Sequence, residues 1–193
     1  MNMLLDRVPD HLVISGTRYR IHTSFRTWIS YEKLLTENSE VSIQEVFSLV
    51  FDGIVPTPKH YDEAVEQILW FYQCGKESQT TGSKAHKEVF SYDYDDGYIV
   101  AAFQEQYGID LNTADLHWWK FRAFMLSLSE DTELVKIMGY RSVEITSKMS
   151  AAQRSFYQKM KKHYRLPMKK ADQERINQLE DALLNGESLD GLL

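Results

Sequence analysis

Apolar residues recur along most of the chain with the spacing of amphipathic helices, and only near the N-terminus with the spacing of strands. Residues 11–14 and 18–23 are β-prone runs on either side of Ser15 and Gly16, where glycine tolerates a positive φ. They predict a small β-hairpin. Because an isolated hairpin is marginal in water, we expect it to lie against the helices.

The rest of the chain is dominated by helical periodicity, with capping residues and stops between the periodic segments. Ser42 and Glu45 have the spacing of a capping box, as do Ser150 and Gln153. The pattern predicts helices over 24–36, from 43 to a stop at Gly53, 59–74, from 93–96 to 107, 114–128, 130–138 with a stop at Gly139, 150–164 and 171–184. In the third of these, the residues expected inside are Ala64, Val65, Ile68, Leu69 and Phe71.

The predicted helix 114–128 carries apolar side chains on two faces, including the tandem Trp118 and Trp119. A helix of that kind is expected to be buried between neighbours, so we predict that it is the central helix. Its cap would be Asn112 or Thr113. The fold class is therefore mainly α, a compact multi-helix domain with a small N-terminal β-hairpin and C-terminal amphipathic helices.

Two parts follow from this pattern. Residues 1–148 form a helical body that includes the hairpin and a polar, mobile loop near 76–90, and residues 149–193 form basic amphipathic C-terminal helices. These helices carry apolar stripes that either pack on the body or bind a partner helix in a groove. The candidate partner-binding residues are Phe156, Met160, Tyr164, Ile176, Leu179 and Leu183.

Charge is unevenly distributed along the chain. The net charge is −6, yet residues 148–175 hold nine Lys or Arg against two acidic residues, a net of +7, so the remainder carries −13. Such a segment could bind nucleic acid, or dock on an acidic body or partner. Cys74 is the single cysteine, and the sequence has neither a signal-peptide pattern nor an apolar run long enough to span a membrane. We therefore expect a soluble cytoplasmic protein.

Candidate chemistry is sparse. Asp93, Asp95 and Asp96 could offer oxygen ligands to Ca²⁺ or Mg²⁺, but carboxylates at this position more often cap and complement a helix N-terminus. His117 could act as a base, although a histidine beside two tryptophans is more often a hydrogen-bonded core residue. The histidines and Cys74 lack zinc-site spacing, and no nucleophile motif or phosphate-binding loop is present. We predict no enzyme activity, no metal site and no cofactor.

One segment resembles a known family. The residues DYDDGYIVAAFQEQYGIDLNTADLHWWKFRAFMLSL (93–128), followed by KIMGYR (136–141) and the Leu-Pro pair at 166–167, are similar to the bacteriophage gene-product-fifteen family of tailed phages. The YGIDL turn closely followed by LHWW is the most specific part. The signature positions are interpreted as core and turn determinants: Tyr107, Asp110, His117, Trp118, Trp119 and Lys120.

The resemblance implies a phage tail assembly chaperone that acts in the cytoplasm of the bacterial host. Such a protein would transiently bind the tape-measure protein and tail-tube subunits without catalysis, and it could form a homo-oligomer. Physically, a long helical tape measure exposes apolar seams until it is enclosed, and amphipathic helices could cover them. Two alternatives remain: a structural tail protein retained in the virion, and a nucleic-acid-binding protein that uses residues 148–175.

Overall fold

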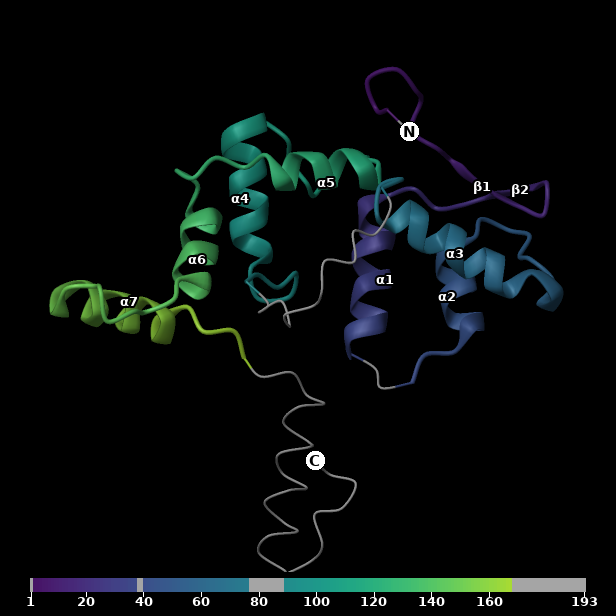
Figure 1. Cartoon of the computed structure of the whole chain (residues 1–193). Coiled ribbons are helices and arrows are strands. Elements are labelled where there is room, and N and C mark those ends of the chain that lie inside the picture. Colours follow the sequence, from purple (N-terminus) through teal and green to yellow (C-terminus); the bar gives the residue numbers. More distant parts are fainter. Residues whose placement is uncertain (1, 38–39, 77–88, 168–193) are drawn as a thin grey trace, which may run out of the picture.

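The computed structural model describes residues 2–37, 40–76 and 89–167. Within these ranges the chain is mainly α, with seven α-helices and one two-stranded sheet, which confirms the predicted fold class. The predicted helix 171–184 and most of the predicted loop near 76–90 lie outside the described residues. Figure 1 shows the hairpin with α1–α3 on one side and α4, α6 and α7 on the other, with α5 between them.

The predicted hairpin is confirmed. Strands β1 (His11–Ile14) and β2 (Thr17–Arg20) pair antiparallel, and the two turn residues, Ser15 and Gly16, have φ of 47° and 76°. Two positive φ values in succession are typical of the tight turns that match strand twist. Alternate side chains of β1 are buried, and the strand lies on α3, so the helices support the hairpin as expected.

Helices α1 (Phe25–Glu37) and α2 (Ile43–Val50) follow the hairpin, and the capping box of Ser42 and Glu45 is present. The predicted stop at Gly53 is wrong. The helix ends at Val50 because the next residue, Phe51, turns to an extended conformation and forms a bridge with Ile21. The hydrophobic side chain of Phe51 is buried by this change of direction.

A short 3₁₀ turn (Pro58–His60) leads into α3 (Tyr61–Tyr72), close to the predicted 59–74. Ala64, Ile68 and Phe71 are buried as predicted. Val65 and Leu69 were expected inside and are not, since their side chains are 38% and 41% exposed. They lie one turn apart on the outer face, because the hairpin and α5 cover only one side of this helix.

The second half contains α4 (Asp96–Tyr107), α5 (Trp118–Leu126), α6 (Glu133–Ser142) and α7 (Ala151–His163). Helix α4 stops at Gly108, whose φ is +66°, as predicted. Three predicted boundaries are wrong: α5 begins four residues later than Ala114, α6 begins at Glu133 instead of 130, and α6 runs through Gly139. Gly139 stays helical because its carbonyl accepts a regular helical hydrogen bond from the Val143 N–H, 3.0 Å away.

Helix α5 begins late because the residues before it pair with another segment. The Phe25 N–H donates to the Leu116 carbonyl at 2.9 Å, and the Trp118 N–H donates to the Thr23 carbonyl at 2.8 Å. These bonds hold the chain extended up to His117, which becomes the cap in place of Asn112 or Thr113.

Aromatic side chains fill the core between the two sides of the molecule. Phe121 stacks between Phe25 and Phe103, with ring centroids 4.9 Å and 5.1 Å away. Trp118, Trp119 and Phe121 are all buried, as expected for a central helix. The expectation fails for the last turn of α5, where Leu126 is 72% exposed. Burial of α5 is therefore confined to its first turns.

Candidate partner-binding site

Helix α7 carries the part of the predicted partner-binding set that the structure describes. It contacts α6, yet none of its residues is buried. Figure 1 shows α7 extending away from the α4–α6 group at the edge of the molecule. A helix displayed in this way needs a firm attachment if it is to bind anything with a defined geometry.

The attachment is built on a buried ion pair between α6 and the start of α4. Both guanidinium NH₂ groups of Arg141 on α6 donate to the carboxylate of Asp95 at the start of α4, over 2.6 Å and 2.9 Å. The two side chains are only 9% and 1% exposed. Bidentate pairing of this type is short and directional, so it fixes the relative positions of α4 and α6.

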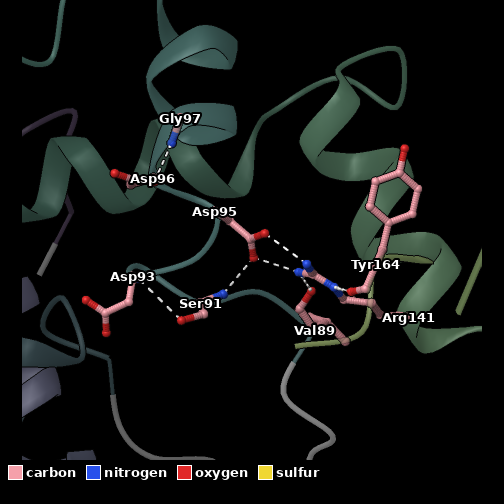
Figure 2. Close-up of polar contacts among 8 residues, drawn as sticks. All are labelled: Val89, Ser91, Asp93, Asp95, Asp96, Gly97, Arg141 and Tyr164. Carbon is pink, nitrogen blue, oxygen red and sulfur yellow. Dashed lines mark hydrogen bonds and ion pairs between the residues drawn. The ribbon is translucent and has the colours of Figure 1, made fainter. Parts of the chain in front are cut away.

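The same arginine also fixes the end of α7 (Figure 2). Its Nε donates to the backbone carbonyl of Tyr164 at 2.6 Å, and one terminal nitrogen donates to the carbonyl of Val89 at 3.1 Å. Asp95 in turn accepts a bond from the Ser91 N–H at 2.8 Å. One buried pair thus joins the segment before α4, the start of α4, α6 and the last turn of α7.

The aspartates predicted to complement the helix N-terminus have three different roles. Asp95 makes no capping bond and forms the ion pair instead, which corrects the interpretation for this residue. Asp93 pairs with Lys33 of α1, and Asp96 accepts a bond from the Gly97 N–H. Across the described residues, no group of three or more His, Cys, Asp or Glu is placed to hold a metal ion.

The predicted apolar stripe of α7 divides between two faces. Tyr164 and Met160 are half-buried, and the Tyr164 ring stacks on that of Tyr140 of α6 at 5.8 Å. Phe156 lies at the border, with its ring 6.0 Å from the same tyrosine and its side chain 47% exposed. Their role in binding stays a prediction, and Ile176, Leu179 and Leu183 lie outside the described residues.

The cations of α7 also divide. Arg154 donates to the carbonyls of Ser147 and Met149, and Lys161 donates to that of Arg141. Lys159 and Lys162 are exposed, and among the described residues neither has an ion pair. The outward face of α7 therefore combines a half-exposed aromatic ring with two cations.

His117, the candidate base, is held by backbone groups. Its Nδ1 accepts the Trp119 N–H at 3.0 Å, so the proton lies on Nε2, which is 3.0 Å from the Pro9 carbonyl. Burial lowers the pKa of the imidazole and favours the neutral ring that this cap requires. Both nitrogens are thus occupied, and the residue acts as a helix cap.

A comparison with known families decides what the chain is related to. The model of the Bacteriophage Gp15 protein family matches residues 4–166. The chain belongs to this family. It is accordingly a bacteriophage protein, and the family indicates a structural or morphogenetic role. No curated protein and no solved structure matches the chain.

The signature tryptophans of this Gp15 protein hold the end of α3. Trp118 donates its indole N–H to the carbonyl of Tyr72 at 2.9 Å, and Trp119 donates to that of Phe71 at 2.7 Å. Carbonyls at a helix C-terminus lack partners within the regular helix. Each indole supplies a donor to one of them, and the Phe71 carbonyl also accepts the Cys74 N–H at 3.0 Å. The chain then turns at Gly75, where a Cβ would lie 2.8 Å from the Trp119 ring.

The YGIDL signature is a turn. The Tyr107 hydroxyl donates to the carbonyl of Phe124 at 2.8 Å, and the Asp110 carboxylate accepts the Asn112 N–H at 2.9 Å. Arg26 of α1 donates to three carbonyls at and after this turn, those of Leu111, Asn112 and Ala114. Lys120 is exposed, so it is the one signature residue whose surroundings do not explain its identity.

Proposed function

We propose that this Gp15 protein is a tail assembly chaperone that transiently binds the tape-measure protein and tail-tube subunits, without catalysis, in the cytoplasm of the bacterial host. Family membership supports the phage context, and the Gp15 family is not a known enzyme family. No helix in the described ranges has both the length and the apolar character that a membrane crossing requires.

The observation that carries the proposal is the attachment of α7. Its last turn is fixed by Arg141, yet the helix buries none of its residues. A helix that is held in place and open on one side suits recognition of another helix, because little flexibility is lost on binding. The half-exposed ring of Phe156 supplies an apolar anchor on that side.

Co-expression with helical fragments of the same phage's tape-measure protein tests this role. We expect the fragment to become soluble and to co-elute with the chain. Replacing Phe156 by serine should weaken the complex, because its half-exposed ring is the apolar anchor on the open side of α7. The matched control is Leu126→Ser, which removes an exposed apolar side chain from α5. Absence of a complex, or equal loss in the control, would contradict the proposal.

The alternative is a tail protein that is retained in the virion. The two roles differ in whether the chain dissociates from its partners before the virion is complete. Mass spectrometry of purified particles separates the two roles. A chaperone should be absent from mature virions and present in tail precursors, whereas a structural subunit should be found in both at a fixed ratio to the tail-tube protein.

Nucleic-acid binding is a second candidate because residues 148–165 hold six Lys or Arg and no acidic residue. If DNA is the ligand, affinity should fall steeply with salt, since phosphate contacts release counterions. Replacing Lys159 and Lys162 should then lower DNA affinity at every sequence. Binding that is weak and unaffected by these changes would leave the chaperone proposal as the better account of the basic helix.

A further inference from the structure

Helix α3 presents an exposed face that is acidic and apolar, whereas the outer face of α7 is basic and apolar. Its exposed residues Asp62, Val65, Glu66 and Leu69 follow one another at helical spacing on one side. Among the described residues neither carboxylate has an ion pair. We name these four residues the α3 face.

The outer face of α7 offers the complementary groups. Phe156, Lys159 and Lys162 are exposed and succeed each other at intervals of three residues, which places them on one side of the helix. The two helices have 12 and 13 residues, so two faces of nearly equal length can lie side by side. We name these three residues the α7 face.

The two faces cannot meet within one molecule. Figure 1 shows α3 and α7 at opposite ends of the structure, with α1, α5, α4 and α6 between them. The aromatic core and the buried ion pair of Arg141 with Asp95 hold this arrangement. A contact between the faces therefore needs two copies of the chain.

We infer that the chain self-associates by docking the α7 face of one copy on the α3 face of another. The apolar side chains would form the centre of the contact, and each lysine would approach a carboxylate. Opposite charges at matched positions select this pairing over contacts of α3 with α3 or of α7 with α7, which would place like charges together.

The contact should be weak and sensitive to salt. Two helices of this length bury less than the ~800 Å² per partner of a stable complex. Exposed ion pairs are also screened at physiological ionic strength. The proposal does not depend on the chaperone role, because the purified chain alone is sufficient to test it.

Sedimentation of the purified full chain over a wide concentration range at low salt gives the first measurement. We expect the average mass to rise above that of a monomer with concentration and to return to it when salt is raised. A chain that stays monomeric at the highest concentration, or whose association does not weaken with salt, would overturn the inference.

Charge reversal then identifies the faces. Lys159→Glu with Lys162→Glu makes both faces acidic, and Asp62→Lys with Glu66→Lys makes both basic. Each variant alone should remain monomeric. An equimolar mixture should associate again, because each molecule then meets a face of opposite charge. If the mixture stays monomeric, the pairing of α3 with α7 is refuted.

A matched control changes the same net charge elsewhere. Lys120 and Lys136 are exposed on α5 and α6, and replacing both by glutamate should leave association at the level of the unmodified chain. If this control abolishes association as fully as the α7 reversal, the effect is one of total charge and the proposed contact is wrong.

Discussion

The core around α5 and the attachment of α7 are held together mainly by different interactions. Around α5, aromatic rings pack against one another. The side chains of Trp118, Trp119 and Phe121 are buried among aromatic side chains from α1, α3 and α4. At α7, no side chain is buried, and the helix end is fixed by the Arg141 guanidinium through a backbone carbonyl. The region around α5 relies mainly on area removed from water, whereas the end of α7 combines directed bonds to Arg141 with half-buried ring contacts on Tyr140.

The difference has consequences for how each region tolerates change. An apolar core accepts substitutions of similar volume, because its contacts are many and individually small. The ion pair depends on two residues, and loss of either leaves a buried charge without a partner. Damage to the core should therefore scale with the volume lost, whereas damage to the attachment should depend on which partner is removed.

The largest expected effect is from Trp119→Ala. Removing a buried tryptophan costs about 3–5 kcal/mol of unfolding free energy. The carbonyl of Phe71 also loses its indole donor, about 1 kcal/mol, although it keeps the Cys74 N–H. Urea unfolding followed by circular dichroism measures the loss. The control is Leu126→Ala in the same helix, which should change stability by about 0.5 kcal/mol or less, since its side chain is exposed. Equal losses in the two variants would contradict the burial described for α5.

A smaller effect is expected from Arg141→Met. This change leaves the Asp95 carboxylate buried, with the Ser91 N–H as its remaining partner. The unfolding free energy should fall by about 3 kcal/mol, which is the low end for a broken buried ion pair because one hydrogen bond to the carboxylate remains. The double variant with Asp95→Leu should be more stable than Arg141→Met alone, because it removes the unpaired charge.

Limited proteolysis distinguishes attachment from general stability in these variants. In Arg141→Met the chain after α6 should be cleaved earlier than the body, because the last turn of α7 has lost its donor. If the double variant is less stable than the single one, or if cleavage spreads evenly over the chain, the ion pair is not the specific anchor of α7.

The features that sequence predicted well depend on neighbours in the chain. Glycine after serine specified the hairpin turn, Gly108 specified the end of α4, and the capping boxes at Ser42 and Ser150 specified two helix starts. In each case the deciding bonds join residues at most a few positions apart, so a local pattern contains the necessary information.

The features that sequence missed depend on distant residues. Arg141 and Asp95 are 46 positions apart, and neither has a local pattern that marks a buried pair. The start of α5 was missed because pairing with residues 23–25 keeps the preceding residues extended, although their periodicity is helical. For the candidate site, apolar spacing gave Phe156 as a candidate partner-binding residue, but it left open whether the stripe packs on the body, and it did not identify Arg141 as the residue that fixes the helix.

A third prediction concerns acid and the cap of α5. The folded state prefers a neutral His117, because burial lowers its pKa, whereas the unfolded chain protonates this ring at its ordinary value near 6.5. The unfolded state then binds more protons as pH falls, so this stability contribution is complete above pH ~6.5 and is lost below it.

The variant His117→Asn isolates this contribution from the other histidines. Asparagine also caps helices, so the unfolding free energy at neutral pH should fall by only about 1 kcal/mol. The part of the decrease in stability at low pH that is due to this ring should disappear. Urea unfolding at several pH values between 5 and 8 measures the difference from the unmodified chain. A difference that does not shrink as pH falls would show that His117 does not favour the neutral form.

The smallest stability effect is expected where binding matters most. Phe156 is about half exposed, so Phe156→Ala should lower the unfolding free energy by about 1 kcal/mol or less, well below the loss in Arg141→Met. The ion pair contains no atom of this residue, so proteolysis after α6 should match that of the unmodified chain. Unfolding and proteolysis together measure this. A loss of 3 kcal/mol, or early cleavage of α7, would show that this ring and not Arg141 holds the helix, and the contrast between an apolar core and a polar attachment would fail.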